Sequence, residues 1–233
     1  MNTILALESS AETCSVALLA GGDTLLKIHD QARQHAQVFL PLVDAVLSEA
    51  QLSLSQVDAI AFSRGPGSFT GIRICLGVVQ GLALGAELPV IPVSTLQALA
   101  VAGGREGLGK PGDHLLTAFD ARMQEVYCAE YCLTDSIPQL ITDEAVLPIA
   151  KAQDWLNSHQ NAIAVGSAWS IPELAESARE TCFPELVISA LDIVNIAQVL
   201  YEHGKAVAID DAAPVYLRNE VTWKKRQPIR KAT

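Results

Sequence analysis

The sequence predicts an α/β fold made of two similar lobes. Short apolar strand patterns alternate with amphipathic helix patterns, and half of the 233 residues are hydrophobic. The glycine-rich stretch 103–112 divides the chain, and the pattern after it begins as the first half does. We therefore expect duplicated βββαβα lobes at residues 1–104 and 105–218, followed by a basic, flexible tail at 219–233.

Three strand patterns open the first lobe, and the turn Gly21-Gly22-Asp23 joins the second strand to the third. Their ranges are 4–8, 14–20 and 24–29. An amphipathic helix is expected at 33–50, and Pro41 inside it predicts a bend or a late start. Its apolar stripe comprises Val38, Phe39, Leu42, Val43, Val46 and Leu47.

Strand and helix then alternate through the rest of the chain. In the first lobe, strands are expected at 57–62 and 89–93, each followed by a helix, with Ser68 or Thr70 as the N-cap of the longer helix. In the second lobe, strand patterns cover 115–119, 125–133 and 162–165, and helix patterns cover 150–158 and 190–203. Each lobe opens with a strand that ends in an acidic residue and leads into a hairpin, which favours the actin-like ATPase (ASKHA) architecture.

The composition indicates a folded, soluble chain. Charged residues make up only 18% of it, so disorder is not expected over most of its length. The first apolar run has no basic segment before it and ends at Glu8, too early for a signal peptide or a membrane span. We expect a cytoplasmic protein without membrane contact. The cysteines lack zinc or redox spacing and are expected to be buried and reduced; they are Cys14, Cys75, Cys128, Cys132 and Cys182.

The net charge of −10 is unevenly distributed. Five basic residues lie in the last ten positions, so the preceding residues carry −15. These five are Lys224, Lys225, Arg226, Arg230 and Lys231. An acidic body is poorly suited to bind a nucleic-acid backbone by itself. The basic tail is therefore either a solvated terminus or an RNA contact made within a complex.

The segment Gly65-Pro66-Gly67-Ser68-Phe69-Thr70-Gly71-Ile72-Arg73 runs from a strand into a helix. Backbone N–H groups at such a turn are able to converge on an anion, so Gly65 and Gly67 are candidate cofactor-binding residues. The segment matches neither a Walker A loop nor a dinucleotide fingerprint. Its glycines are equally consistent with a sharp turn, and the pattern alone leaves both interpretations open.

Three glycines in the following helix, Gly77, Gly81 and Gly85, repeat every four residues on one face. Each costs about 1 kcal/mol relative to alanine in a helix interior. A smooth face of this kind permits close approach of another backbone. That neighbour is either the sheet of the same lobe or a helix of a partner.

The candidate catalytic carboxylates are Glu8, Glu12 and Asp120. Glu8 and Asp120 end the first strand of each lobe, where actin-like ATPases place acids near the magnesium–nucleotide complex. No histidine or lysine close in the sequence completes a catalytic group around either residue. The five histidines form no metal-binding pair, and no G-x-S-x-G nucleophile motif is present. We expect no self-contained catalytic or metal site.

Four segments together resemble the TsaB (YeaZ) family across essentially the whole chain, the GPGSFTG-x-R and DARM-x-EVY strings being the most specific. The segments are 4–10, 65–73, 120–127 and 214–218. The resemblance implies an actin-like fold and a heterodimer with the related catalytic subunit TsaD. With TsaE, that heterodimer transfers a threonylcarbamoyl group to the N6 amine of adenosine 37 in tRNAs that read codons beginning with A.

Compared with TsaD, this chain lacks the residues that bind metal. The two histidines of the TsaD H-x-E-G-H motif fall on Thr95 and Leu99, and neither side chain is a plausible iron or zinc ligand. The glycine pair of the TsaD adenosine motif is reduced here to Gly166. The resemblance therefore implies no metal, no cofactor bound by the chain alone, and ATP or ADP only at a site shared with TsaD.

In the family, two helices of the first lobe pack against the corresponding TsaD helices as a four-helix bundle. The resemblance thus assigns the partner interface to eight residues: Val38, Phe39, Leu42, Val43, Val46, Gly77, Gly81 and Gly85. It also implies a homodimer through the same face when TsaD is absent, and contact with tRNA through the complex.

The sequence therefore predicts a non-catalytic scaffold subunit that activates a tRNA-modifying complex and has no activity alone. The alternative is a stand-alone actin-like ATPase or kinase, or a peptidase that acts on TsaD. Steady ATP turnover that Asp120→Asn abolishes, or clean cleavage of TsaD, would favour the alternative.

Overall fold

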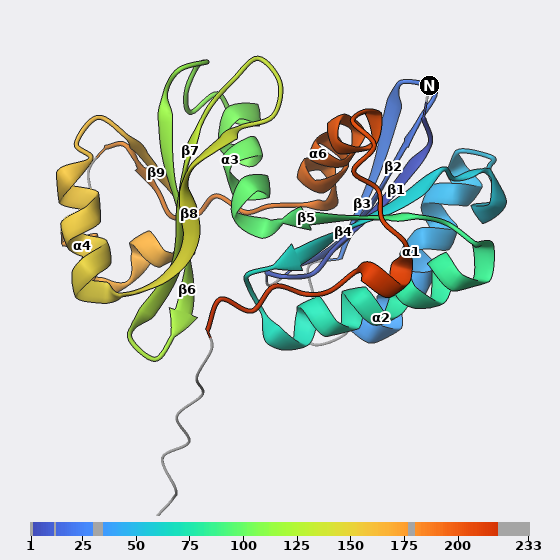
Figure 1. Cartoon of the computed structure of the whole chain (residues 1–233), viewed down its shortest axis with the longest axis horizontal. Helices are drawn as coiled ribbons and strands as arrows, with labels where there is room; N and C mark the ends of the chain where they lie inside the picture. The colour runs from blue at the N-terminus through green and yellow to red at the C-terminus, as the bar shows by residue number, and fades with distance from the viewer. Residues whose placement is uncertain (1, 12, 30–34, 177–179, 219–233) are drawn as a thin grey trace, which may run out of the picture.

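The computed structural model describes residues 2–11, 13–29, 35–176 and 180–218. Two α/β lobes lie side by side, with helices α3 and α6 between them (Figure 1). Each lobe contains a five-stranded sheet, in the order β3-β2-β1-β4-β5 in lobe 1 and β8-β7-β6-β9-β10 in lobe 2. The first strand of each lobe is therefore central, with a hairpin on one side and parallel strands on the other. This repeated order confirms the predicted two-lobed, actin-like α/β fold.

Lobe 1 follows the predicted boundaries closely. Its elements are β1 (Ile4–Glu8), β2 (Cys14–Ala20), β3 (Asp23–His29), α1 (His35–Glu49), β4 (Ala59–Gly65), α2 (Phe69–Ala86), β5 (Val90–Ser94) and α3 (Thr95–Arg105). Ser68 is the N-cap of α2 as predicted, since its hydroxyl accepts a hydrogen bond from the Gly71 N–H at 3.2 Å. Pro41 lies inside α1.

Lobe 2 repeats this order. Its elements are β6 (His114–Arg122), β7 (Glu125–Cys132), β8 (Gln139–Pro148), α4 (Ile149–Ser158), β9 (Ile163–Val165), α5 (Pro172–Ala175), β10 (Cys182–Phe183) and α6 (Ala190–Glu202). Both lobes therefore have the order βββαβαβα. The elements expected one by one in the first lobe are all present, whereas the repeat order βββαβα was one strand and one helix too short. The edge strand β8 is not apparent in the sequence, because residues 139–143 are exposed and show no apolar alternation.

One hydrophobic core joins the lobes. Helix α6 packs on β1 and β2 of lobe 1, although it is the last α-helix of the described residues, and α3 packs on β6 of lobe 2 (Figure 1). Gly103 in α3 faces lobe 2 so closely that a Cβ there would lie 2.7 Å from Cδ2 of Leu115. The glycine-rich stretch predicted as a linker therefore begins inside helix α3. A boundary between residues 104 and 105 separates the two sequence repeats, but the hydrophobic core continues across it.

Helices α1 and α2 cover the outer face of the lobe 1 sheet, opposite α6. Among the described residues, α2 is the one helix long and apolar enough to cross a membrane. In this fold one side of it packs on the sheet instead, where Ile72, Cys75 and Val79 are buried. The other side of α2 lies at the molecular surface.

Cys14, Cys75, Cys128 and Cys132 are free thiols, but the prediction that all five cysteines are buried is wrong for two of them. Cys14, Cys75 and Cys128 are buried, whereas Cys132 and Cys182 are partly exposed. Burial raises the pKa of the Cys14 and Cys128 thiols to about 12. These thiols are therefore protonated and weakly nucleophilic at neutral pH.

Candidate partner surface and catalytic positions

The glycine-rich turn between β4 and α2 packs directly against the turn between β1 and β2. The Ser68 N–H donates to the Ser10 carbonyl at 2.7 Å, and the Ser9 hydroxyl donates to the Gly71 carbonyl at 3.0 Å. A Cβ on Gly67 would lie 2.6 Å from the Ser10 carbonyl oxygen. Backbone from residues 9–10 therefore occupies the space before the α2 N-terminus, where an anion would otherwise bind. This geometry favours the interpretation of the glycines as a sharp turn over their interpretation as an anion-binding site.

Gly65 serves a second close contact. Its φ of +102° is strained for any other residue, and a Cβ there would lie 2.9 Å from the Val215 carbonyl oxygen. The Val215 N–H in turn donates to the Arg64 carbonyl at 2.8 Å. The C-terminal segment thus covers the candidate cofactor residue Gly65.

The candidate acid Glu8 is sealed inside lobe 1, with none of its surface exposed. Its Oε1 accepts hydrogen bonds from the Ser10 N–H at 2.6 Å and the Ser10 hydroxyl at 2.5 Å, while its Oε2 has no partner among the described residues. Burial raises the pKa of this carboxyl, and the nearby Asp192 raises it further. In this conformation Glu8 is therefore a buried acid that no ligand reaches.

The candidate acid Asp120 is held by its own hairpin. Its carboxylate accepts from the Arg122 N–H at 2.7 Å and from the Arg122 guanidinium at 2.8 Å. Among the described residues, Asp120 forms no ion pair with a histidine or a lysine and belongs to no metal-binding cluster. Glu12, the third candidate, lies outside the residues that the structure describes.

The β6–β7 hairpin carries an unusual turn. Its two central residues, Met123 and Gln124, have φ values of +56° and +63°, the conformation that normally selects asparagine and glycine. Arg218 holds this turn, since its guanidinium donates to the carbonyls of Ala121 and Arg122 at 3.1 and 3.2 Å. It also pairs with Glu125 at 2.5 Å. The C-terminal segment therefore bridges lobe 1 at Arg64 and lobe 2 at this hairpin.

The two positions that the resemblance described above aligns with metal-binding histidines are enclosed in the core. Thr95 and Leu99 lie one turn apart on α3, and both are buried. Gly166 packs against the same helix, because a Cβ there would lie 2.5 Å from Cδ2 of Leu99 and 2.4 Å from the Ala118 carbonyl oxygen. Its φ of +105° also requires glycine. Gly166 thus has a packing role.

The apolar stripe on α1 divides between core and surface. Phe39, Val43 and Val46 are buried against the sheet, which corrects their assignment to a partner interface, because they offer almost no surface. Val38 and Leu42 are only partly buried and remain candidates for contact. Leu40, which lies outside the predicted stripe, is 56% exposed on the same helix.

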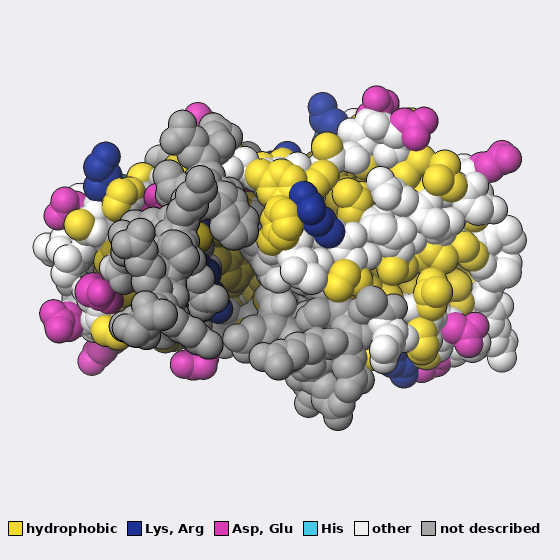
Figure 2. Space-filling view, turned by 90° about the horizontal axis from the view of Figure 1, so that it is seen from below, with side chains coloured by type: hydrophobic (Ala, Val, Ile, Leu, Met, Phe, Trp, Pro, Cys, Tyr) yellow, Lys and Arg dark blue, Asp and Glu magenta, His cyan; other side chains and the backbone are white. Residues whose placement is uncertain are grey.

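The glycine face of α2 points to solvent and not to the sheet. A Cβ placed on Gly77, Gly81 or Gly85 would meet no atom within 4 Å, so packing on the lobe's own sheet does not explain these glycines. Leu84 lies beside them and is 64% exposed. Hydrophobic side chains spread over this lower face of lobe 1, with charged ones mainly at its margins (Figure 2). The outer side of α2 is therefore a smooth, apolar surface that no other part of the described chain covers.

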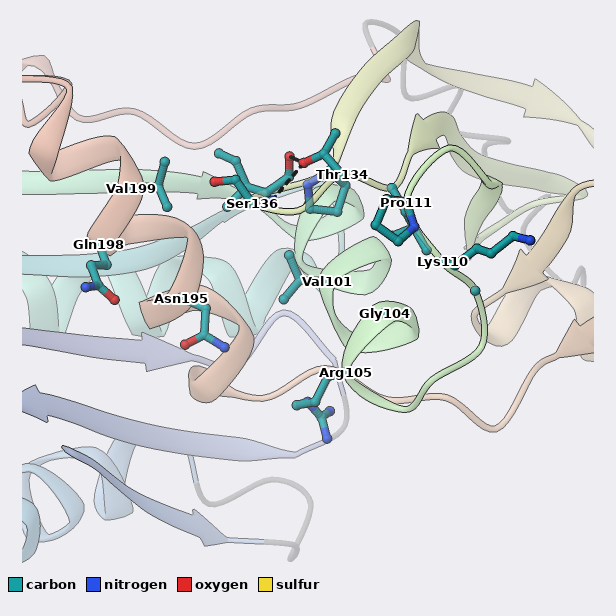
Figure 3. A pocket seen from close by; sticks show the side chains of 14 residues that line it. Val101, Gly104, Arg105, Lys110, Pro111, Thr134, Ser136, Asn195, Gln198 and Val199 are labelled. Carbon is teal, nitrogen blue, oxygen red and sulfur yellow. Dashed lines mark hydrogen bonds between the residues drawn. The ribbon is translucent and has the colours of Figure 1, made fainter. Parts of the chain in front are cut away.

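A hollow of about 450 Å³ lies between α3, α6 and the loops at 109–111 and 133–138. Its polar lining includes Arg105 on α3 and both Asn195 and Gln198 on α6 (Figure 3). Arg105 is already paired with Asp192 at 3.0 Å. None of the candidate site residues from the sequence lines this hollow.

The contact of Arg73 with Phe69 and Tyr216 is a surface feature that the sequence does not predict. The guanidinium of Arg73 lies 3.8 Å from the centre of the Phe69 ring and donates through Nε to the Tyr216 hydroxyl at 3.0 Å. The motif containing Phe69 and Arg73 and the segment containing Tyr216 both stand out in the sequence. Nothing in the sequence pairs them, because 143 residues separate Arg73 from Tyr216.

Comparison with known proteins relates the whole chain to tRNA-modification proteins. Residues 28–229 match the family model described as TsaD, tRNA N6-adenosine threonylcarbamoyltransferase. The chain is 41% identical over 227 residues to the tRNA threonylcarbamoyladenosine biosynthesis protein TsaB of Escherichia coli, covering 95% of this chain and 97% of that protein. It is 37% identical over 233 residues to the protein of the same name from Haemophilus influenzae, covering 96% of each.

A solved structure shares the fold over nearly the full length. YeaZ from Pseudomonas aeruginosa superimposes with a TM-score of 0.82 at 41% identity, covering 93% of this chain and 100% of that one.

Proposed function

We propose that this chain, which belongs to the TsaB family of tRNA threonylcarbamoyladenosine biosynthesis proteins, acts there as a non-catalytic partner subunit. Its partner is a catalytic subunit of the TsaD type, and TsaE joins the pair as a third component. The assembly transfers a threonylcarbamoyl group to the N6 amine of adenosine 37 in tRNAs that read codons beginning with A. The complex acts in the cytoplasm.

The observation that carries this proposal is the unpartnered outer face of α2. Three glycines face solvent at a cost of about 1 kcal/mol each, and no atom of the described chain approaches them. The exposed Leu40 and Leu84 add apolar area on the same pair of helices. Contiguous apolar surface is typical of a protein interface, and a row of glycines lets a partner helix approach closely.

Three features support a role without catalysis. Glu8 is buried, Asp120 is bound within its hairpin, and Thr95 and Leu99 are enclosed where the related transferase family carries histidines. The described residues contain no group of acidic, histidine or cysteine side chains arranged to hold a metal. A chain with these features contributes shape and contacts to an enzyme complex.

Nucleotide binding is assigned to a site shared with the catalytic subunit. The N-terminus of α2 is filled by Ser9 and Ser10, and Gly65 is covered by Val215, so ATP or ADP finds no ready phosphate site on this chain alone. When the catalytic subunit is absent, the α1–α2 face pairs with its copy in a second chain. Such a homodimer is isologous, with the same patch used on both sides.

Reconstitution tests this function. The isolated chain is expected to leave tRNA unmodified, and modification is expected when TsaD, TsaE, ATP and threonylcarbamoyl-adenylate are added to it. Omitting only this chain from the mixture should abolish or strongly reduce the product. Modification by the isolated chain would overturn the proposal.

A further inference from the structure

One inclined row of residues runs along the outer side of α2. Phe69, Arg73, Gly77, Gly81 and Gly85 follow one another at intervals of four residues, and all five are exposed. Residues four apart are neighbours on an α-helix, and such rows are the ridges against which other helices pack. The row is therefore one continuous surface: an aromatic ring and a guanidinium at its start, and the smooth glycine row Gly77, Gly81 and Gly85 after them.

Arg73 is the only charged side chain among the 18 residues of α2. Its guanidinium lies 3.8 Å from the centre of the Phe69 ring, and its Nε donates to the Tyr216 hydroxyl at 3.0 Å. These two contacts hold the cation in place at the surface. Among the described residues, no carboxylate forms an ion pair with it. Arg73 is therefore an ordered cation without a counter-ion in the described chain.

A helix that covers the glycine row also covers Arg73. A partner helix as long as α2 measures about 27 Å, so when it is centred on Gly81 it extends about 13 Å to either side. Arg73 lies about 12 Å from Gly81 along the helix axis, so the end of such a helix lies over Arg73. Enclosing a cation in an apolar contact is strongly unfavourable unless a counter-ion accompanies it. The covering helix must then supply that negative charge.

We propose that Arg73 binds a carboxylate of the partner subunit, carried by the partner helix that packs on the glycine row. The inference rests on the proposed function, which supplies a TsaD-type subunit as the partner, and it adds the chemistry by which that partner is recognised and aligned. Only Nε of the guanidinium is used within the described chain, so its two terminal nitrogens are available for a bidentate ion pair.

Calorimetric titration of the full-length chain with the TsaD-type subunit, over a salt series, tests the pair. Arg73→Met keeps a long side chain against Phe69 but removes the charge. It is expected to weaken binding about 10-fold and to reduce the salt dependence of the affinity. Arg73→Glu brings two like charges together and is expected to weaken binding about 100-fold. Wild-type affinity of both variants would overturn the inference.

Charge reversal on the partner identifies the carboxylate. Each exposed aspartate or glutamate on the helices of the TsaD-type subunit is replaced by lysine, one in each variant. One of these variants is expected to bind the wild-type chain more weakly and to restore binding of Arg73→Glu by at least 10-fold. If no reversal restores the binding of Arg73→Glu, the cation does not pair with a partner carboxylate and the inference is wrong.

Lys151→Glu is the matched control, because it makes the same change in net charge at an exposed lysine of α4 in lobe 2. It should bind the TsaD-type subunit as the wild type does. An equal loss of affinity in Lys151→Glu and Arg73→Glu would show an effect of net charge and overturn the inference. Circular dichroism checks the fold of every variant, and Arg73→Met decides the outcome if Arg73→Glu does not fold.

Leu84→Lys separates this inference from the proposed function. If Leu84→Lys weakens binding while both Arg73 variants bind as the wild type does, the outer side of α2 is the interface and the ion pair is wrong. If the wild type itself does not bind the TsaD-type subunit, the proposed function is wrong, and the inference that rests on it is overturned as well.

Discussion

A Cβ atom on Gly71 would lie 1.9 Å from the carbonyl oxygen of Ser9. The first turn of α2 and the β1–β2 turn therefore approach more closely than any residue with a side chain permits. The glycine-rich motif that resembles a phosphate loop is thus used to pack backbone against backbone. Gly77, Gly81 and Gly85, later in the same helix, face open space instead. The two groups of glycines therefore have different structural roles.

The first prediction contrasts these groups. Gly71→Ala should destabilise the fold by roughly 2 kcal/mol or more, because the Cβ meets backbone that has little freedom to move. Gly81→Ala should stabilise it by about 1 kcal/mol, since the site is open and alanine is the better helix former. Urea unfolding followed by circular dichroism measures both values. Equal effects of the two substitutions would contradict the assignment of separate roles.

The second prediction concerns Glu8. Because burial raises its pKa above the ordinary value of 4.5, the native chain keeps the proton at pH values where the unfolded chain has released it. The free energy of unfolding of the wild type should therefore fall as the pH rises from 4.5 to the native pKa of Glu8. Glu8→Gln should remove up to about 1.4 kcal/mol of this loss per pH unit.

Unfolding free energies measured from pH 5 to pH 7 check this prediction. Glu173→Gln, at an exposed position on α5, is the matched control and should leave the pH slope unchanged. If Glu8→Gln leaves the slope of unfolding free energy against pH unchanged, the Glu8 carboxyl is ionised in both the native and the unfolded state.

The third prediction concerns the β6–β7 turn. The double substitution Met123→Asn and Gln124→Gly should stabilise the fold by about 1–2 kcal/mol, because asparagine and glycine adopt positive φ with little strain. Thermal unfolding measures the gain. A loss of stability would mean that the side chains of Met123 and Gln124 contribute more than the turn conformation costs.

The fourth prediction concerns the C-terminal segment. Arg218→Gln should lower the free energy of unfolding by about 1–3 kcal/mol, since the variant loses the Glu125 pair and the donors to the hairpin carbonyls. Hydrogen exchange should accelerate mainly at residues 120–126. Lys110→Gln, which removes a charge from the loop before β6, should leave that exchange unchanged. Uniform acceleration across both lobes would indicate general destabilisation and not release of the hairpin.

Local sequence patterns predicted most of the secondary structure. The hairpin of β2 and β3, the N-cap at Ser68 and the ends of α6 depend on nearby residues, so turn composition and periodicity reveal them. Strand β8 escaped because its first half is exposed on both faces. The packing of α6 on lobe 1 is a long-range choice that no local pattern encodes.

The candidate site was less predictable for the same reason. Periodicity shows that one face of α1 is covered, but it does not say by what, and Phe39 proved to lie in the core of its own lobe. The acid at the end of β1 suggested a ligand site, whereas its burial depends on the close contact between residues 9–10 and α2. The pairing of Arg73 with Tyr216 required the fold itself.

The affinity of this chain for the TsaD-type subunit decides whether the outer face of α2 is the partner interface. Calorimetry measures it, with Leu84→Lys and Val187→Lys as a matched pair. Leu84 and Val187 are 64% and 60% exposed, so neither substitution should disturb the core. Leu84 lies on the outer face of α2, and Val187 lies in the loop after β10. We expect at least a 10-fold loss of affinity for Leu84→Lys and wild-type affinity for Val187→Lys. Equal affinities of the wild type and Leu84→Lys would contradict this expectation.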